Sequence, residues 1–462
     1  MTSSAFEPAS QPISLAPSAF ESWRERNGEG CWPGRLPSDW TSTRLKRLFR
    51  LVNGATPKST EPAYWGGEIP WATPEDLGGD NSLYLRNTKR TLTASGLRNC
   101  GASMVPEGSL LLSTRAPIGY VRLAAQQTST NQGCRSLVPQ GAVADSRYYY
   151  FALTAARAVL EAYGTGSTFT ELSNTELGLV EVPVPPAQLQ RSIAEFLEHA
   201  TGRIDALIGQ KERLIELLEE KRTALINQAV TKGLDPDVPM KGSGVEWLGE
   251  IPEHWSARRL KSVARVIPSS VDKKTREGQR AVRLCNYTDV YYSEKICAAD
   301  GLMEATASDS ELAKFQLREG DVIVTKDSES ADDIAVPAYV ARNLENVLCG
   351  YHLAIVRPRR AALNGRFLAY CFESRRLVQQ FHVAANGITR FGLSVHSLRD
   401  GWLPIPPIEE QHRIASRLDA ESQTVRTLST KVREVVALLR EYRSALITAA
   451  VTGKIDVRDH AA

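Results

Sequence analysis

Hydrophobic positions follow a seven-residue period in two long stretches of the chain, each of which begins at a pair of prolines. The stretches cover 184–235 and 405–456, align without a gap at a fixed offset of 221 residues, and are identical at 18 of 52 positions. Proline disfavours helix before it and is tolerated in a first turn, and neither stretch contains proline after its opening pair. The pattern predicts a helix of roughly 40 residues in each stretch, about 60 Å long at 1.5 Å per residue.

The apolar residues of each helix fall on two positions of a heptad, a narrow seam that is typical of a coiled coil. The first position holds Ile204, Leu218 and Leu225 in one helix, and Val425, Val432, Leu439 and Leu446 in the other. The second position holds Leu207 and Leu214, and Leu428, Val435 and Tyr442. Two copies in one chain favour pairing with each other, and a pseudo-twofold relation would make the pair antiparallel. The alternative is that each helix packs on its own globular half.

The repeat extends beyond the helices. A Pro-x-x-Trp-x-x-x-Arg-Leu-Lys string begins at Pro37 and again at Pro252, and a Gly-x-Thr-x-x-x-Leu-Ser string begins at Gly166 and again at Gly387. Internal repeats of this length predict two similar structural units. The predicted order is a disordered tail (1–33), a globular domain (34–183), a helix (184–232), a linker (233–249), a second globular domain (250–404), a second helix (405–453) and a C-terminal tail (454–462).

Each globular part mixes strands with a helix that precedes the long one. Strands are expected at 109–113 and 119–123 in the first part, and at 321–325 and 351–356 in the second. Single helices are expected over 145–163 and 364–381. The predicted fold class is therefore α+β, with two similar α/β domains separated by two long helices that pair as an antiparallel coiled coil.

Composition restricts the setting of the protein. With 462 residues, the chain can form two or three domains with full cores. No segment approaches the roughly 20 apolar residues of a membrane span. The seven cysteines are scattered and include no Cys-x-x-Cys pair, which favours a reducing cytoplasm and disfavours a zinc site.

A search for catalytic motifs finds none. The sequence contains no Gly-x-x-x-x-Gly-Lys-Ser/Thr phosphate loop and no strand-linked Gly-x-Gly-x-x-Gly. Neither Pro-Pro pair belongs to an Asn/Asp-Pro-Pro-Tyr/Phe loop of the kind an amino-methyltransferase needs, and the seven histidines are dispersed. The sequence therefore predicts no catalytic residue and no metal site.

Polar and basic loops of the globular parts are better suited to nucleic acid. The net charge of +3 is small, but 255–283 holds nine Lys or Arg against two acids. Glycine allows a close approach to phosphate, Arg and Lys can bond guanine, and Asn and Gln can bond adenine. For each candidate, a structural turn or cap is the alternative. The candidate DNA-contacting residues are Lys58, Arg115, Asn131, Gln132, Thr165, Gly166, Ser167, Thr168, Lys273, Lys274, Arg276, Asn286, Lys326, Asn386, Gly387, Thr389 and Arg390.

These strings together resemble the specificity subunit of type I restriction-modification systems. The resemblance covers roughly 36–456 and includes Gly-Ala-Thr-Pro at 54–57, Tyr-Trp-Gly-Gly-Glu-Ile-Pro-Trp at 64–71 and Glu-Trp-Leu-Gly-Glu-Ile-Pro-Glu-His-Trp at 246–255. It also includes the Pro-Pro-x-x-x-Gln start of each long helix.

The resemblance implies a non-catalytic subunit with two target recognition domains, each of which would recognise one half of a split DNA site. The paired helices would fix the gap between the halves. Two modification subunits would methylate adenine with S-adenosylmethionine, and two restriction subunits would cleave DNA with ATP and Mg²⁺. This chain would bind double-stranded DNA and none of these cofactors. The alternatives are a self-sufficient methyltransferase or nuclease, which the missing motifs disfavour, and a coiled-coil scaffold with two binding modules.

Overall fold

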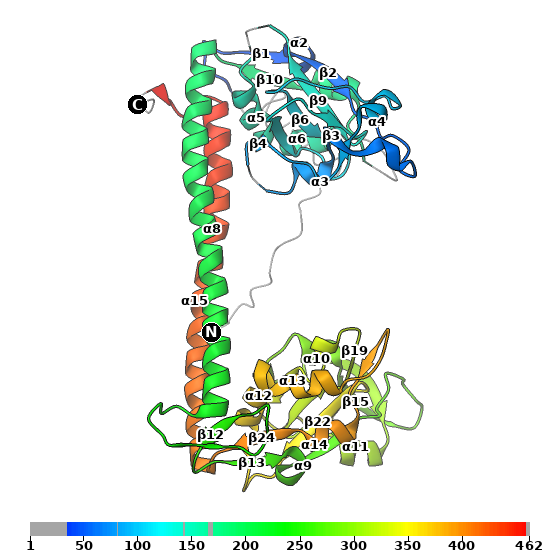
Figure 1. Ribbon diagram of the computed structural model, residues 1–462, viewed down its shortest axis with the longest axis vertical. Helices are drawn as coiled ribbons and strands as arrows, with labels where there is room; N and C mark the ends of the chain where they lie inside the picture. The colour runs from blue at the N-terminus through cyan, green and yellow to red at the C-terminus, as the bar shows by residue number, and fades with distance from the viewer. Residues whose placement is uncertain (1–34, 81, 142–143, 165–169, 459–462) are drawn as a thin grey trace. The chain divides into compact units, whose positions relative to one another are not determined.

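The structure is a computed structural model that describes residues 35–80, 82–141, 144–164 and 170–458. The chain divides into two compact units. Unit 1 runs up to Lys211 and resumes at Glu434, and unit 2 is Glu212–Arg433. Each unit contains one globular domain, called domain 1 or domain 2 below, together with one segment of each long helix (Figure 1).

Domain 1 is built from one five-stranded and one three-stranded sheet, closed by a two-stranded ribbon. The strand orders are β2-β9-β6-β7-β4, β5-β3-β8 and β1-β10. The strands are β1 (Thr41–Arg44), β2 (Phe49–Asn53), β3 (Trp65–Ala72), β4 (Tyr84–Leu85), β5 (Thr91–Leu92), β6 (Leu110–Ser113), β7 (Val121–Ala124), β8 (Ser129–Thr130), β9 (Cys134–Pro139) and β10 (Glu181–Val184). The helices are α2 (Leu45–Leu48), η1 (Pro62–Tyr64), α3 (Pro74–Leu77), α4 (Ala94–Arg98), α5 (Ser146–Ala155), α6 (Arg157–Ala162) and α7 (Asn174–Leu179).

Domain 2 repeats this topology with the orders β14-β22-β18-β20-β16, β17-β15-β21 and β13-β24, and adds the ribbons β11-β12 and β19-β23. The strands are β11 (Met240–Gly242), β12 (Glu250–Pro252), β13 (Ser256–Arg259), β14 (Ala264–Pro268), β15 (Arg280–Cys285), β16 (Lys295–Ile296), β17 (Met303–Ala307), β18 (Val322–Thr325), β19 (Asp327–Ser328), β20 (Pro337–Val340), β21 (Val347–Cys349), β22 (Leu353–Pro358), β23 (Phe391–Gly392) and β24 (Trp402–Ile405). The helices are α9 (Leu260–Val263), α10 (Tyr287–Tyr291), α11 (Asp309–Phe315), η2 (Ala331–Asp333), α12 (Gly365–Glu373), α13 (Arg375–Ala384) and α14 (Val395–Asp400).

The two long helices are α8 (Ala187–Lys232) and α15 (Ile408–Val451), and each begins directly after its Pro-Pro pair. The glutamine of the repeated Pro-Pro-x-x-x-Gln string is fully buried in both copies. Gln190 Oε1 accepts a hydrogen bond from Asp145 N at 3.0 Å, and Gln411 Oε1 accepts one from Asn364 N at 2.8 Å. Since each glutamine bonds the N-cap residue of α5 or α12, the string fixes each globular domain onto its long helix.

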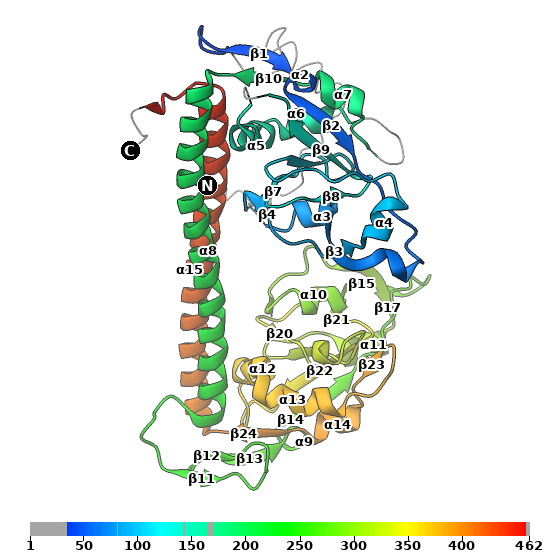
Figure 2. The same ribbon diagram turned by 45° about the horizontal axis from the view of Figure 1, so that its top comes forward.

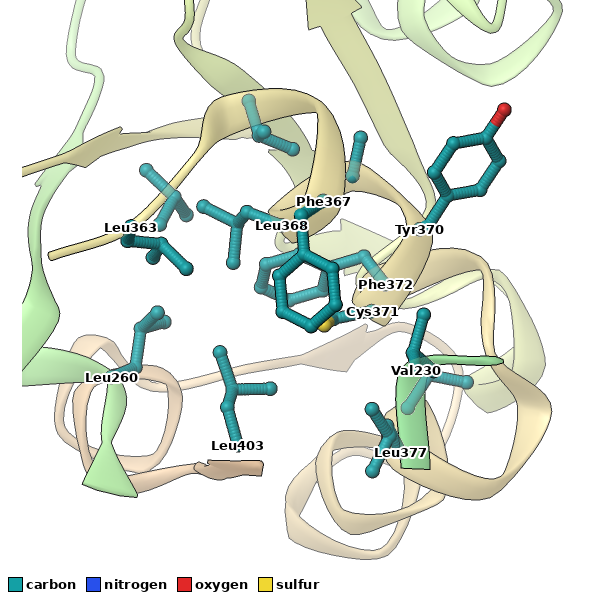
Figure 3. Close-up of a cluster of buried hydrophobic side chains, with 14 of the residues drawn as sticks. Val230, Leu260, Leu363, Phe367, Leu368, Tyr370, Cys371, Phe372, Leu377 and Leu403 are labelled. Carbon is teal, nitrogen blue, oxygen red and sulfur yellow. The ribbon is translucent and has the colours of Figure 1, made fainter. Parts of the chain in front are cut away.

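Both long helices also contribute side chains to the core of each domain. In unit 2, Val230 of α8 packs in one cluster with Phe372 and Leu377, as Figure 3 shows. Tyr370 points its ring away from the centre of this cluster, and its hydroxyl lies 3.2 Å from Asp419 Oδ1 of α15. In unit 1, the hydroxyl of buried Tyr148 donates to Val451 O of α15 at 3.0 Å.

Within each unit, the α8 and α15 segments lie side by side and run antiparallel, as the repeat predicts (Figures 1 and 2). In unit 1, Ile204 and Ile208 of α8 form a cluster with Val436 of α15, and Arg443 Nε lies 2.9 Å from Asp205 Oδ1. In unit 2, Arg222 donates to Ser422 Oγ of α15 at 3.2 Å.

One of the two predicted seam positions is correct and the other is displaced by one residue. The residues predicted for the first position are all buried or half-buried: Ile204, Leu218, Leu225, Val425, Val432, Leu439 and Leu446. The residues predicted for the second position are more than a third exposed: Leu207, Leu214, Leu428, Val435 and Tyr442. The residue that follows each of them faces the partner helix instead, and polar Ser429 and Arg443 at such positions hide the true register from an apolar pattern.

The helix that precedes each long helix is interrupted, contrary to the prediction of a single element. In domain 1, Ala156 separates α5 from α6. In domain 2, Ser374 ends α12 and caps α13, with its hydroxyl accepting a hydrogen bond from Leu377 N. A serine cap of this kind starts a new helix because its side chain satisfies a free backbone N–H. In the described part of the chain, no helix has the length and apolar character of a membrane span.

The corrected seam predicts different effects for two neighbouring positions of α8. Ile208→Ala removes a buried side chain and should lower the free energy of unfolding of the full chain by about 2–4 kcal/mol. Leu207→Ala changes a side chain that is 38% exposed and should lower it by about 1 kcal/mol or less. Urea denaturation measures both values, and a larger loss for Leu207→Ala would contradict this register.

Candidate nucleic-acid interface

Three loops of domain 2 meet just beyond the C-terminal end of β18. Lys326 follows this strand directly, and its backbone N donates to His352 O at 3.0 Å while its O accepts from Leu393 N at 2.7 Å. The adjacent Asp327 pairs with Gly392 in the short β19–β23 ribbon. In both views this ribbon lies on the side of domain 2 away from the long-helix segments of unit 2 (Figures 1 and 2).

The side chains at this meeting point form a mixed-charge group, here called the Asp327 cluster: Lys326, Asp327, Tyr351, His352 and Arg390. Asp327 Oδ2 lies 2.7 Å from Lys326 Nζ and 3.0 Å from His352 Nδ1. Arg390 Nη2 lies 3.4 Å from His352 Nε2. Lys326 Nζ stands 5.0 Å above the centre of the Tyr351 ring, within cation–π range.

The Asp327 cluster is partly open to solvent and retains its charges. Tyr351 is 51% exposed, and the Asp327 side chain is 24% exposed. Burial raises the pKa of the Asp327 carboxyl, but hydrogen bonds from Lys326 and His352 outweigh it and the net pKa is lowered. The carboxylate is therefore ionised at neutral pH, and it faces Lys326 together with nearby Arg390. The cluster thus offers one strong acceptor and two charged donors, Lys326 and Arg390, to a polar partner.

Domain 1 has the same backbone arrangement at the corresponding place. Thr114 N donates to Gly133 O, and Thr114 O accepts from Leu172 N, each at 2.8 Å. Arg115 forms an isolated antiparallel bridge with Glu171. Matching these bonds with those of domain 2 gives six pairs of equivalent positions: Thr114 and Lys326, Arg115 and Asp327, Gln132 and Tyr351, Gly133 and His352, Glu171 and Gly392, and Leu172 and Leu393. The backbone arrangement is repeated and the leucine is buried in both domains, whereas the side chains of the other five pairs differ.

Domain 1 therefore presents a different chemistry at this place. Arg115 Nε lies 3.0 Å from Glu171 Oε2, and Arg135 Nη2 lies 3.2 Å from Glu171 Oε1. Gln132 is exposed and its side-chain oxygen accepts a hydrogen bond from the Thr56 hydroxyl. A carboxamide and an arginine–glutamate pair replace the lysine–aspartate–histidine group of domain 2.

Two tryptophans of the Tyr-Trp-Gly-Gly-Glu-Ile-Pro-Trp string hold the loop that carries Lys58. Trp71 Nε1 donates to Ala55 O at 2.9 Å, and Trp65 Nε1 donates to Lys58 O at 3.2 Å. Ala55 N in turn donates to Thr130 O at 2.9 Å. The string thus places exposed Lys58 on a loop that begins next to the strand leading to Gln132.

In domain 2, a corresponding basic loop begins next to the Asp327 cluster. Tyr351 N donates to Val271 O at 2.8 Å, and Lys273, Lys274 and Arg276 follow on the exposed loop between β14 and β15. Arg276 Nη2 lies 3.4 Å from Asp272 Oδ2. This ion pair is exposed and therefore contributes little to stability, which leaves the cations available to a phosphate backbone.

The loop before β23 holds the remaining candidates of domain 2. Asn386 and Gly392 exchange backbone hydrogen bonds, so that Gly387, Thr389 and Arg390 lie on the exposed turn between them. Gly387 has a φ of 153°, and a Cβ there would lie 1.9 Å from Arg390 O. The turn therefore requires glycine at this position. The equivalent candidates in domain 1, Thr165, Gly166, Ser167 and Thr168, lie outside the described residues.

Two candidate residues have structural roles, and three cluster members were not predicted. Asn286 is 8% exposed and caps α10, and its Nδ2 donates to Leu284 O at 3.4 Å, so its prediction as a surface contact is wrong. Asn131 Oδ1 accepts from Gly133 N at 3.0 Å and stabilises a turn. Asp327, Tyr351 and His352 were not predicted, because candidates were selected for contacts with phosphate, guanine or adenine, and acids and aromatics match none of these. The described residues contain no group of side chains suited to hold a metal ion.

Comparisons with known proteins identify the family. The family model described as "Type I restriction modification DNA specificity domain" matches residues 37–217 and 252–436, which is more than half of the chain. The chain is 28% identical to the type I restriction enzyme MjaIX specificity subunit of Methanocaldococcus jannaschii, over 92% of this chain and 96% of that protein. It is 22% identical to the EcoBI specificity subunit of Escherichia coli, over 91% of this chain and 87% of that protein.

A solved structure from work on complex assembly and conformational transition of the type I restriction-modification system has the same fold. It matches 92% of this chain and 100% of its own, with a TM-score of 0.71 and 16% sequence identity. The two matched segments correspond to the two domains with the adjoining parts of their helices. The chain therefore belongs to the family of type I restriction-modification DNA specificity subunits, with two DNA-recognition domains in tandem.

Proposed function

We propose that each domain recognises a different half of a split DNA site, and that bases are contacted at the loops beyond β6 in domain 1 and β18 in domain 2. The observation that carries this proposal is the set of five equivalent positions at which one backbone arrangement bears two different chemistries. The hydrogen-bond donors and acceptors of side chains at such positions distinguish one base pair from another. Two domains with the same fold but different side chains there would therefore recognise different sequences. Exposed Lys58, Lys273 and Lys274 would neutralise phosphates and hold the domains in register on the duplex.

In this proposal, the long helices determine the distance between the two half-sites. Helix α8 has 46 residues and α15 has 44, and each contributes a segment to both units. At 1.5 Å per residue, such helices are about 65–70 Å long. A continuous helix resists bending and stretching, so a split site should have a spacer of one fixed length.

The helices also carry two exposed apolar patches that are suited to partner subunits. The patch of unit 1 consists of Leu207, Val435, Leu438 and Tyr442, and the patch of unit 2 consists of Leu214, Leu217 and Leu428. The 221-residue offset relates Leu207 to Leu428, Val435 to Leu214, and Leu438 to Leu217. Residues three, four and seven apart share one face of a helix, so Val435, Leu438 and Tyr442 of α15 lie together in the first patch, as do Leu214 and Leu217 of α8 in the second. Two equivalent patches would bind two modification subunits, one per unit.

Catalysis would then belong to the partners. The modification subunits would bind S-adenosylmethionine and methylate adenine, and two restriction subunits would use ATP and Mg²⁺ to cleave. The names of the relatives support this assignment, because each of those proteins is a specificity subunit of a type I restriction enzyme. This chain would contribute recognition of double-stranded DNA and would bind none of these cofactors.

Replacing the interior of domain 2, 265–392, with that of another family member should change one half-site and leave the other intact. The physical reason is that the base-contacting loops of each domain belong to that domain alone. Methylation-aware sequencing of cells that carry the modification subunit and the exchanged chain gives the motif. The reciprocal exchange in domain 1 is the control, and alteration of both halves by a single exchange would contradict the proposal.

A charge in one apolar patch should remove one modification subunit. Leu438 is 63% exposed and Leu217 is 46% exposed, so both can be replaced without opening a core. Native mass spectrometry of the co-expressed complex should show one bound modification subunit for Leu438→Asp and for Leu217→Asp, and none for the double variant. Ser444→Asp is the control, because this exposed residue lies roughly on the opposite face of α15, at about 100° per residue. Two subunits bound to the double variant would exclude these patches as docking sites.

A further inference from the structure

The Asp327 cluster combines a carboxylate with cationic side chains at a solvent-accessible surface. Within this cluster, Lys326 and Arg390 carry permanent donors, Asp327 carries an ionised acceptor, and no carboxamide is present. We propose that this cluster recognises a G·C base pair in the half-site of domain 2, a proposal that rests on the recognition function given above. Asp327 would accept a hydrogen bond from cytosine N4, and Lys326 or Arg390 would donate to guanine O6 and N7.

The chemistry of the base edges favours this pair. In the major groove, a G·C pair exposes two neighbouring acceptors on guanine and one amino donor on cytosine, and Lys or Arg with Asp or Glu are the side chains that match them. An adenine is matched by Asn or Gln, which offer a donor and an acceptor in one planar group. Domain 1 has Gln132 at the position of Tyr351, so the absence of a carboxamide at this position distinguishes domain 2 from domain 1 rather than reflecting the fold.

The cluster is also held in place before any ligand arrives. Asp327 lies in the β19–β23 ribbon, and the backbone of Lys326 is hydrogen bonded through both its N and its O. The neighbouring Ser328 is buried, and its Oγ lies 3.1 Å from the hydroxyl of Tyr287 in α10. Side chains fixed in this way lose little conformational entropy on binding, which strengthens discrimination between base pairs.

The charged side chains of the cluster are neither fully buried nor fully exposed, as recognition of a base edge requires. The side chains of Lys326, Asp327 and His352 are 16%, 24% and 31% exposed. Fully exposed charges would be solvated by water and would discriminate weakly, whereas fully buried charges could not reach a base. An ion pair used only for stability would need no open face, yet Arg390 on the outer loop is exposed and extends the cluster towards solvent.

The first test changes the DNA and uses the wild-type chain in complex with its modification subunits. Its result therefore does not depend on whether a protein variant folds. After the methylated motif is known, each guanine of the half-site of domain 2 is replaced in turn by 7-deazaguanine, which lacks the N7 acceptor. Binding to labelled duplexes should weaken by about 5- to 150-fold at one G·C pair. A half-site of domain 2 without any G·C pair, or unchanged binding at every substituted guanine, would overturn the proposal.

The second test is Asp327→Asn in the same complex, with Asp332→Asn as the matched control. Asp332 is on the same domain and its side chain is 91% exposed, so the control makes the same change of charge outside the cluster. Asp327→Asn should relax the preference at the same G·C pair by about 5- to 150-fold, while the half-site of domain 1 stays unchanged. Unchanged discrimination at that pair would overturn the inference but leave the proposed function standing. A wild-type complex that methylates no split motif would instead contradict the proposed function itself.

Discussion

The cores of the two domains are completed by residues from the long helices, and the rest of the structure depends on this shared packing. Val230 of α8 and Ile414 of α15 belong to the same buried cluster as the central side chains of domain 2, and Ile193 and Ile447 do the same in domain 1. Neither domain has a complete core without its helix segments. This packing occupies one side of domain 2, and the β19–β23 ribbon, which carries Asp327, lies on the other side (Figures 1 and 2).

Buried glutamines and charged pairs make this packing specific. Gln190 and Gln411 satisfy the free N–H of a capping residue, so a shift of either helix by one residue would leave buried polar groups unpaired. The arginines related by the repeat, Arg443 and Arg222, bond different partners: Asp205 in unit 1, and Glu373 together with Ser422 in unit 2. The framework is repeated while its contacts have diverged, as they have in the loops of the two domains.

The organisation of the chain could be predicted from the sequence because short local patterns mark each long helix and each domain, and because these patterns occur in two copies. Proline pairs, heptads and an ungapped repeat are sufficient to locate both helices and both domains. The second seam position could not be derived in the same way. An apolar pattern selects Leu207 and Leu428, whereas the structure buries the residues that follow them, Ile208 and Ser429. In α15 a buried serine carries no hydrophobic signal, and in α8 Leu207 and Ile208 are both apolar, so the pattern does not choose between them and tertiary contacts reveal the register.

The candidate site was predicted less well, for a related reason. Residue type alone suggested Lys326 and Arg390 as DNA contacts, and the structure brings both beside His352 and Asp327, but it also suggested Asn286, whose amide is used inside the domain. It omitted Asp327 because only contacts with phosphate, guanine and adenine were considered, and an acid matches none of these. The significance of Asp327 depends on its contacts with Lys326 and His352, a residue 25 positions further along the chain, and such pairings are set by strand topology rather than by local sequence.

Methylation-aware sequencing of cells that contain the wild-type chain and its modification subunit tests the central claim most directly. If the two domains recognise DNA through different side chains and continuous helices set the spacing of the half-sites, the methylated motif consists of two unlike half-sites. These halves are separated by unspecified bases of one fixed length, and each half carries a methylated adenine. A single continuous motif, or two half-sites separated by a variable number of bases, would contradict this account.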